Sequence, residues 1–169
     1  LNDFEVVFVD NNSTDNSLQI ANEWRSAHPL GNFIITSETK QGASYARNTG
    51  AKLASGQWLC FMDDDAVAFP DFVQNILNHI NTYPDRVGFG GRIIPKYIPH
   101  EPSWMSYYVS SMVGHFHYSE TYTPFKNGKY PLESNMIVRK DVYDQVGGFN
   151  EALPGVVGTV RIGGEGKAL

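Results

Sequence analysis

Two clusters of polar residues that follow short apolar runs are the first candidates for chemistry in this sequence. Asp10, Asn11 and Asn12 follow an apolar run at residues 5–9, and three consecutive aspartates at 63–65 follow another at 58–62. Three adjacent carboxylates repel one another, so a cation among them would stabilise the second cluster. Ligands that offer only oxygen favour a hard ion such as Mg²⁺ or Mn²⁺ over Zn²⁺. A solvated acidic turn is the alternative.

The elements that must position these clusters follow a regular alternation. Apolar runs predict strands, and helical periodicity predicts helices that begin at Ser13 or Thr14, at Gly42 and at Pro70. Small residues at helical spacing would let the second helix lie close against a sheet. This alternation is typical of an α/β fold, with a Rossmann-like, open, mostly parallel sheet flanked by helices. The predicted strands are residues 5–9, 32–36, 58–62 and 87–94, followed later by 135–139.

In such a sheet, ligands bind at the carboxyl ends of the strands. Both polar clusters follow strand ends, so we expect them to share one edge of the sheet. Beyond Pro95 the pattern loosens into an aromatic stretch at 104–118, a turn at Asn127-Gly128 and a short helix that ends at Gly147.

Composition limits the class of protein. The chain has 169 residues, of which 41% are hydrophobic and 18% charged, and this indicates one folded domain rather than a disordered chain. Its net charge of -5 argues against nucleic acid as a partner. Cys60 cannot form an internal disulfide, and its apolar neighbours predict a buried, reduced thiol. No apolar run approaches a membrane span and no secretory signal is visible, so we expect a cytoplasmic protein.

Three motifs in order carry a resemblance to a known family. The run EVVFVDNNSTDNS, the helix segment ASYARNTG and the strand WLCFMDDDAV resemble the nucleotide-sugar-binding half of family 2 glycosyltransferases with the GT-A fold. The resemblance implies one GT-A domain over residues 1–169, with a nucleotide-sugar-binding half at 1–95 and an acceptor-binding half at 96–169. It also implies that the family's usual first strand and helix are missing, so we expect a piece of a longer protein.

The resemblance assigns roles to residues of the first half. Asp10 and Asn11 would hold the nucleobase, with Asn11 in place of the family's usual Asp. Arg47 and Asn48 match the A-R-N positions near the base and phosphates. Two roles come from the D-x-D motif, in which Asp63 would face the ribose and Asp65 would ligate a Mn²⁺ or Mg²⁺ ion that bridges the diphosphate. A metal held by a carboxylate stabilises the charge of a departing nucleoside diphosphate.

The second half supplies the predicted sugar-binding and catalytic residues. Glu133 and Asn135 resemble the family's G-x-N-x-x-x-R strand beside the donor sugar and acceptor, although Glu133 stands where Gly is common. Asp64 and the stacking surface of Trp104 complete the predicted contacts with sugar. Glu165 resembles the catalytic base of the G-E-D region, where this sequence has Gly166 in place of Asp.

The function implied is an inverting glycosyltransferase that moves a sugar from a nucleoside diphosphate, expected to be UDP, to a hydroxyl acceptor in polysaccharide or glycolipid biosynthesis. The partners implied are a nucleotide-sugar donor and a glycan or lipid-linked acceptor. The aromatic stretch around Trp104 also suits peripheral association with the inner face of a membrane.

Two other functions remain open from the sequence. A metal-dependent nucleotide-sugar-binding module without catalysis is suggested by Gly166. A phosphatase of the haloacid-dehalogenase type is suggested by the run FMDDDAV, although such enzymes need a later acidic pair that is not found here. The pair His115 and His117 is a weak metal candidate, because no third ligand stands nearby.

Overall fold

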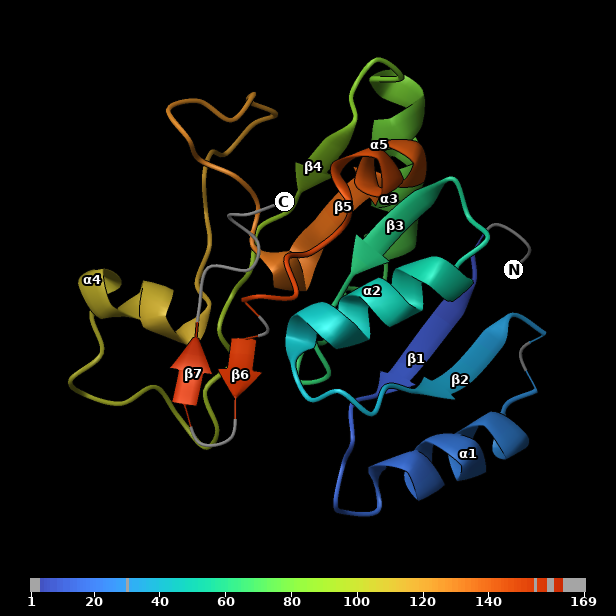
Figure 1. Ribbon diagram of the computed structural model, residues 1–169. Helices are drawn as coiled ribbons and strands as arrows, with labels where there is room; N and C mark the ends of the chain where they lie inside the picture. The colour runs from blue at the N-terminus through green and yellow to red at the C-terminus, as the bar shows by residue number, and fades with distance from the viewer. Residues whose placement is uncertain (1–3, 30, 154, 158–159, 163–169) are drawn as a thin grey trace. The chain divides into compact units, whose positions relative to one another are not determined.

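The computed structural model describes residues 4–29, 31–153, 155–157 and 160–162, which form alternating strands and helices (Figure 1). The chain folds into two compact units. The first unit joins the two ends of the chain, Leu1–Leu59 and Val138–Leu169, and the second unit is Cys60–Ile137. This division differs from the predicted halves at 1–95 and 96–169, which follow the order of the chain.

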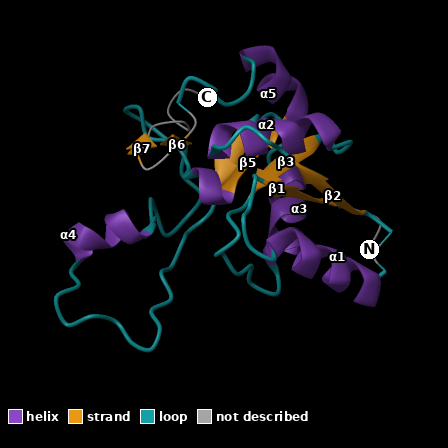
Figure 2. Ribbon diagram, turned by 60° about the horizontal axis from the view of Figure 1, so that its bottom comes forward, coloured by secondary structure: helices purple, strands orange, loops and turns teal. Residues whose placement is uncertain are grey.

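The first unit opens with a β-α-β motif. Strand β1 (Val6–Asp10) pairs in parallel with β2 (Phe33–Ser37), and helix α1 (Ser17–Ala27) connects them. In this register Asp10 lies opposite Ser37, so both strands end at the same edge. Figures 1 and 2 show α1 and α2 (Ala43–Leu53) on opposite faces of the strand pair. The predicted parallel arrangement is confirmed for these two strands.

Helix α1 begins later than the sequence pattern suggested. The Asp15 carboxylate accepts hydrogen bonds from the backbone N–H and the hydroxyl of Ser17, at 3.0 and 2.6 Å. This local turn occupies the residues before the helix, because Asp side chains readily bond to the backbone two residues on. Ser13 and Thr14 therefore do not cap the helix, and that prediction was wrong.

Helix α2 lies very close to β1. A Cβ added at Gly50 would lie 3.2 Å from the Val9 side chain, so a larger residue would push the helix away. The prediction that small residues let this helix approach the sheet is confirmed.

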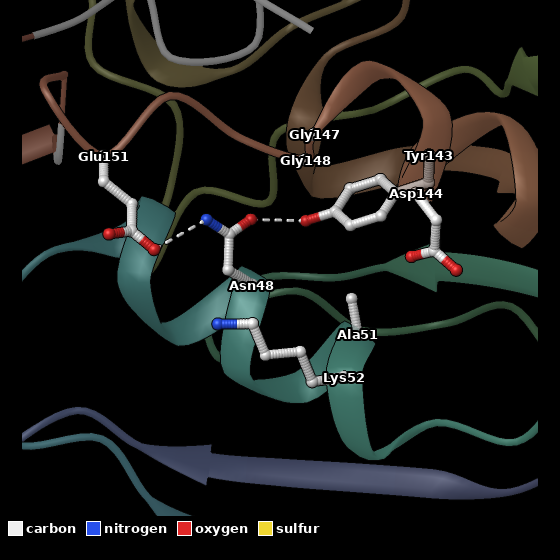
Figure 3. A pocket seen from close by; sticks show the side chains of 8 residues that line it. All are labelled: Asn48, Ala51, Lys52, Tyr143, Asp144, Gly147, Gly148 and Glu151. Atoms are coloured by element: carbon white, nitrogen blue, oxygen red, sulfur yellow. Dashed lines mark hydrogen bonds between the residues drawn. The ribbon is translucent and has the colours of Figure 1, made fainter.

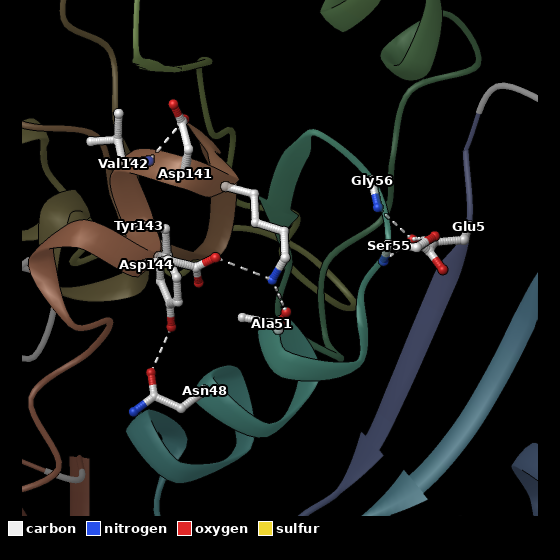
Figure 4. Close-up of polar contacts among 10 residues, drawn as sticks. Glu5, Asn48, Ala51, Ser55, Gly56, Asp141, Val142, Tyr143 and Asp144 are labelled. Atoms are coloured by element: carbon white, nitrogen blue, oxygen red, sulfur yellow. Dashed lines mark hydrogen bonds and ion pairs between the residues drawn. The ribbon is translucent and has the colours of Figure 1, made fainter.

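The Glu5 carboxylate contacts the loop that follows α2. It accepts hydrogen bonds from the backbone N–H groups of Ser55 and Gly56 (Figure 4). Although partial desolvation acts in the opposite direction, these bonds lower the pKa of Glu5 below its ordinary value.

The remaining strands do not extend the β1–β2 pair by hydrogen bonds. Strand β5 lies between β3 and β4 in a three-stranded sheet, and β6 and β7 form a separate antiparallel hairpin. The described strands thus form three hydrogen-bonded sheets, where the sequence predicted one. The further elements are β3 (Trp58–Phe61), α3 (Phe72–Thr82), β4 (Gly88–Gly90), α4 (Tyr107–Ser110), the 3₁₀ helices Ser111–Val113 and Glu133–Asn135, β5 (Met136–Arg139), α5 (Lys140–Val146), β6 (Gly155–Val157) and β7 (Val160–Ile162).

Strand β3 corrects the prediction for Cys60. Leu59 and Phe61 are buried, whereas Cys60 between them is exposed. Successive side chains of a strand point to opposite faces, so an apolar run does not bury every member. Across the described part of the chain, no helix has both the length and the apolar character to cross a membrane.

An aromatic cluster fixes α3 within the second unit. The His79 ring lies 4.8 Å from Tyr83, 4.1 Å from Phe89 and 5.2 Å from Tyr122, measured between ring centroids. Tyr83 and Tyr122 stack on one another at 4.1 Å. Burial among these rings lowers the pKa of His79 and favours its neutral form. The cluster joins α3 to β4 and to the long segment that follows.

Candidate functional site

Asp10, the last residue of β1, has the clearest sign of a ligand-binding role. Its side chain is only 7% exposed, and within the described residues no group donates a hydrogen bond to Oδ1. A buried oxygen without a donor costs about 1–3 kcal/mol, so native structures rarely leave one without a purpose. At the carboxyl end of a parallel strand, the missing donor is one that a ligand can supply. This environment suits the predicted contact with a nucleobase N–H.

The side chain of Asn11, next to Asp10, forms hydrogen bonds with the backbone of a neighbouring loop. Its Nδ2 donates to the backbone oxygens of Glu38 and Lys40, at 3.1 and 2.7 Å, and its Oδ1 accepts from the Gly42 N–H at 2.7 Å. The carboxamide therefore holds the loop between β2 and α2 against the end of β1. An Asp could not donate to two carbonyl oxygens, which gives a physical reason for Asn where the family usually has Asp.

Arg47 lies on α2 with its guanidinium 5.3 Å from the centre of the Phe149 ring. The side chain is half-buried, and contact with an aromatic face restricts its orientation. A guanidinium held in this way is suited to recognise a phosphate or the edge of a base, because its planar fork of donors is already ordered. The nucleotide contact of Arg47 stays a prediction.

Asn48 makes a complete set of internal hydrogen bonds, of which Figure 3 shows those to Tyr143 and Glu151. Its Oδ1 accepts from the Tyr143 hydroxyl at 2.5 Å and from the Phe149 N–H at 2.9 Å. Its Nδ2 donates to the Phe149 carbonyl at 2.9 Å and to Glu151 Oε1 at 3.2 Å. A carboxamide has two donor hydrogens and two acceptor lone pairs, and all four are used. No hydrogen-bonding capacity is left for the predicted nucleotide contact.

Sequence reasoning missed the partners of Asn48. Tyr143 comes from α5, and burial raises the pKa of its hydroxyl to about 12, so it is a donor at neutral pH. Ser44, one turn before Asn48 on α2, is fully buried and donates to the Leu153 carbonyl at 2.8 Å. The spacing of Ser44 and Asn48 places both on one helix face, but no local pattern pointed to their distant partners.

The cavity beside this network is smaller than ordinary ligand pockets. Its volume is about 190 Å³, below the 300–1,000 Å³ or so of ordinary ligand pockets. Lys52, Asp144 and Glu151 contribute charged groups to its wall (Figure 3).

The three aspartates after β3 lie in a turn of the second unit, closed by a hydrogen bond from the Ala66 N–H to the Asp63 carbonyl at 3.1 Å. Asp63 is half-buried, and Asp64 and Asp65 are exposed. No three His, Cys, Asp or Glu side chains of the described residues converge on a metal site. Carboxylate oxygens nevertheless fit Mg²⁺ or Mn²⁺, ions that commonly take their remaining ligands from water and phosphate.

Other predicted sugar contacts also lie in the second unit. Asn135 donates from Nδ2 to the Arg92 carbonyl at 3.4 Å, and its buried Oδ1 meets no donor within the described residues. The same side chain lies so close to Gly91 that a Cβ there would come within 2.8 Å of Nδ2. Glu133 is half-buried, and Trp104 is 68% exposed. The exposed indole suits stacking on a sugar, and the sugar contact of Asn135 stays a prediction.

The predicted aromatic surface divides into two parts. Tyr107 and Tyr108 are exposed like Trp104, whereas Phe116 and Tyr118 pack against Phe125. The histidine pair in this stretch also separates, since His115 bonds to Ser110 at 2.9 Å and His117 lies 3.5 Å from Glu120. These different partners do not support a metal role for the pair.

The predicted catalytic base, Glu165, lies outside the described residues, and so does Gly166. Of the other predicted residues, the structure brings together Asp10, Asn11, Arg47 and Asn48, which all belong to the first unit. Asp63, Asp64, Asp65, Trp104, Glu133 and Asn135 belong to the second unit.

Comparisons with known proteins agree with the family signal in these residues. The family model described as glycosyl transferase family 2 matches residues 1–147. A glucosyl-dolichyl phosphate glucuronosyltransferase of Haloferax volcanii is 29% identical over 115 residues, which are 67% of this chain and 36% of that protein. A PGL/p-HBAD biosynthesis glycosyltransferase of Mycobacterium tuberculosis is 39% identical over 95 residues, 54% of this chain and 36% of that protein. The chain thus spans about a third of the length of these relatives.

A solved structure is similar in fold. The crystal structure of residues 1–349 of Staphylococcus aureus TarS matches with a TM-score of 0.57 and 22% sequence identity. The match covers 89% of this chain and 42% of that one. Together with the family match, it assigns the alternating strands and helices to a fold of the GT-A type.

Proposed function

The chain belongs to glycosyl transferase family 2, and we propose that it transfers a sugar from a uridine-diphosphate donor to a hydroxyl acceptor with inversion at the anomeric carbon. The observation that carries this proposal is the buried Asp10 carboxylate at the end of β1, whose Oδ1 meets no donor in the described part of the chain. A pyrimidine ring N–H is a donor of the kind that this oxygen needs. Family membership also sets aside the haloacid-dehalogenase alternative for the run FMDDDAV.

In this proposal the nucleotide contacts start from the first unit. Asp10 accepts the base N–H, while Asn11 holds the neighbouring loop in place. Arg47 lies on the next helix with its guanidinium ordered by Phe149, and it binds the phosphates or the base. Asp63, at the end of β3, hydrogen-bonds to the ribose hydroxyls.

Asp65 would hold a Mn²⁺ or Mg²⁺ ion together with the diphosphate. The fit rests on its donor chemistry, an exposed carboxylate in an acidic turn, and on phosphate and water as the other ligands. When bound, such an ion supplies positive charge that offsets the charge of the leaving diphosphate. Asp64 is the neighbouring carboxylate available to the donor sugar.

For the transfer itself, we assign Glu165 as the general base. Its carboxylate takes the proton of the acceptor hydroxyl, the acceptor oxygen bonds to the anomeric carbon, and the bond from that carbon to the diphosphate oxygen breaks. Glu133 is the next carboxylate to consider for this role. Asn135 and Trp104 contact the sugars, the first through its Oδ1 and the second by stacking.

The acceptor class is proposed from the relatives. The name of one relative specifies a glucosyl-dolichyl phosphate and another specifies PGL/p-HBAD biosynthesis. The first name prints a sugar linked to dolichyl phosphate, so we propose a lipid-linked or glycan acceptor in glycolipid or polysaccharide biosynthesis. The exposed aromatic residues Trp104, Tyr107 and Tyr108 suit the same surroundings.

A panel of nucleotide sugars tests the proposal in the complete protein. A UDP-sugar at about 100 times its dissociation constant should add about 2.7 kcal/mol of stability, and this should raise the melting temperature only when Mn²⁺ or Mg²⁺ is present. Release of UDP in the presence of an acceptor extract should follow for the same sugar. A stronger shift with ADP than with UDP would contradict the base assignment.

Glu165→Gln tests the base. A general base contributes about 10²–10⁴-fold in rate, so the glutamine variant should lose transfer in that range and keep its affinity for the donor. Glu133→Gln is the matched control. Transfer at the wild-type rate by Glu165→Gln, with loss in Glu133→Gln, would move the role to Glu133.

A nucleotide-sugar-binding module without catalysis is the second candidate, and the residue that favours it is Gly166. The family motif has an Asp there, so this sequence offers one carboxylate fewer. A donor-induced thermal shift without release of UDP, in the presence of acceptor, would support the module over the enzyme.

A further inference from the structure

The face of α2 that turns away from β1 holds a distant segment of the chain, Phe149 to Leu153. Asn48 bonds to both backbone groups of Phe149 and to the side chain of Glu151, and Ser44 bonds to the carbonyl of Leu153. These contacts join residues more than 100 positions apart in the sequence. The segment is therefore fixed at its beginning, middle and end by two side chains of one helix.

Asn48 is the centre of this arrangement. Its side chain is 6% exposed, and its two lone pairs and two N–H groups are all paired with Tyr143, Phe149 and Glu151. Tyr143 adds a third element, because it belongs to α5, which directly precedes the segment. Figure 4 shows the Tyr143 hydroxyl pointing at Asn48 across the gap between α5 and α2.

The glycine pair before the segment lets the backbone pack closely against Asn48 and Tyr143. Gly147 and Gly148 both have positive φ, 87° and 75°, which few other residues adopt without strain. A Cβ at Gly148 would lie 2.7 Å from Asn48 Oδ1 and 3.0 Å from the Tyr143 hydroxyl. The chain therefore leaves α5 directly beside Asn48. Farther along the chain, β6 also contacts α2.

We propose that Asn48 is a positioning residue for the transfer step, which holds the segment Phe149–Leu153 on α2, and that it makes no contact with the donor nucleotide. The inference rests on the proposed function and differs from the nucleotide role that the A-R-N pattern implies. Its neighbour Arg47 is oriented by Phe149, one of the residues that Asn48 fixes. Asn48 thus acts on the reaction through the segment and through the ring that orders Arg47.

Asn48→Asp in the complete protein is the direct test. The change keeps the shape and the acceptor oxygens, removes both donors, and places a second carboxylate beside Glu151. Misplacement by about 1 Å can cost roughly 100-fold in rate, so we expect kcat for sugar transfer to fall about 10- to 100-fold. Because the Phe149 ring also orders Arg47, the dissociation constant for UDP with Mn²⁺ should rise severalfold at most, well below the loss in kcat.

Asn22→Asp on α1 is the matched control, since Asn22 is half-buried and, among the described residues, its side chain bonds only within its own helix, to the Leu18 carbonyl and to Arg25. It should change neither kcat nor the UDP affinity. A rise of tenfold or more in the UDP dissociation constant of Asn48→Asp, at unchanged kcat, would overturn the proposal in favour of a nucleotide contact. Wild-type values for both quantities would overturn it as well.

Glu151 supplies a second route if Asn48→Asp does not fold. Glu151→Gln keeps an oxygen that accepts from Asn48 Nδ2, whereas Glu151→Ala removes it. Glu151 is exposed, so both variants should fold. We expect kcat to fall severalfold in the alanine variant and to be restored in the glutamine variant, with exchange of the 149–153 amides faster only in the former. Equal kcat in both variants would overturn the proposal, and absence of transfer by the wild type would instead reject the proposed function.

Discussion

Two regions that look alike in sequence are built differently in the structure. The base-side cluster, Asp10 and Asn11, lies at the end of β1, and the acidic turn, Asp63 to Asp65, comes shortly after the end of β3. The base-side cluster is enclosed, with Asp10 buried and Asn11 bonded to three backbone groups of the neighbouring loop. The acidic turn exposes two of its three carboxylates.

The difference indicates two ways to prepare for a ligand. In the proposed function, the ligand would supply the hydrogen-bond donor that the buried Asp10 oxygen lacks among the described residues. In the acidic turn, a cation would offset the mutual repulsion of the three carboxylates. Selectivity for the base should therefore arise at β1, and dependence on metal should arise at the turn.

The largest expected effect comes from the acidic turn. Asp65→Asn keeps the shape of the side chain and removes the charge that would hold the cation. We expect Mn²⁺-dependent UDP binding to weaken by about 100-fold or more, close to 3 kcal/mol, at an unchanged melting temperature of the ligand-free protein. Isothermal titration calorimetry with and without Mn²⁺ measures both quantities. Asp64→Asn is the matched control, and an equal loss there would show that the three carboxylates act as one electrostatic site.

The next effect comes from the base-side cluster, where we expect a variant to lose ligand affinity without losing the stability of the ligand-free protein. Asp10→Ala removes a base contact, so we expect UDP affinity to fall about 10- to 100-fold with the metal requirement unchanged. Because the variant also removes a buried oxygen without a donor, the ligand-free protein should melt at the same or a higher temperature. Thermal unfolding and calorimetry measure the two effects. A lower melting temperature together with wild-type affinity would show that Asp10 is a structural residue.

A substitution at Asn11 should lower the stability of the ligand-free protein, unlike the substitution at Asp10. Asn11→Asp restores the family's usual residue but loses the two bonds to the carbonyls of Glu38 and Lys40. We expect the free energy of unfolding to fall by about 1–3 kcal/mol, and amides of the loop at 38–42 to exchange faster. Hydrogen exchange read by mass spectrometry tests this directly. Unchanged exchange at Gly42, whose N–H bonds to Asn11, would contradict the role in the scaffold.

The smallest effect concerns the pH dependence of the same loop. The Thr49 hydroxyl and the Lys40 N–H both donate to the Glu38 carboxylate and hold its pKa below the ordinary value. A lowered pKa in the folded state adds stability above the ordinary pKa of Glu, and this stability is lost as the pH falls through the folded value. Glu38→Gln should therefore flatten slightly the decline of melting temperature between about pH 5 and pH 3. A steeper decline in the variant would contradict this sign.

The sequence alone identified β1 to β5 and the helices α1, α2, α3 and α5, because these have a strong local signal, whereas α4, β6 and β7 were not predicted. Runs of β-branched and aromatic residues predicted β1, β2 and β3, and small residues predicted the close approach of α2 to β1. The start of α1 was wrong because Asp15 forms its own turn with Ser17. Cys60 was wrong because an apolar run does not say which face of a strand is covered.

The sequence also determined the family and the residue types of the site, since a carboxylate, an amide or a guanidinium carries its chemistry wherever it lies. Only the tertiary structure decided which of these groups are occupied by the protein itself. Asp10 and Asn48 both match the family's motifs, yet Asp10 keeps an oxygen without a donor in the described residues and Asn48 uses all four of its hydrogen bonds. The partners of Asn48 come from residues 143–151, and hydrogen bonds between positions about 100 residues apart have no periodic signal in the chain, because they depend on how the segments pack in three dimensions.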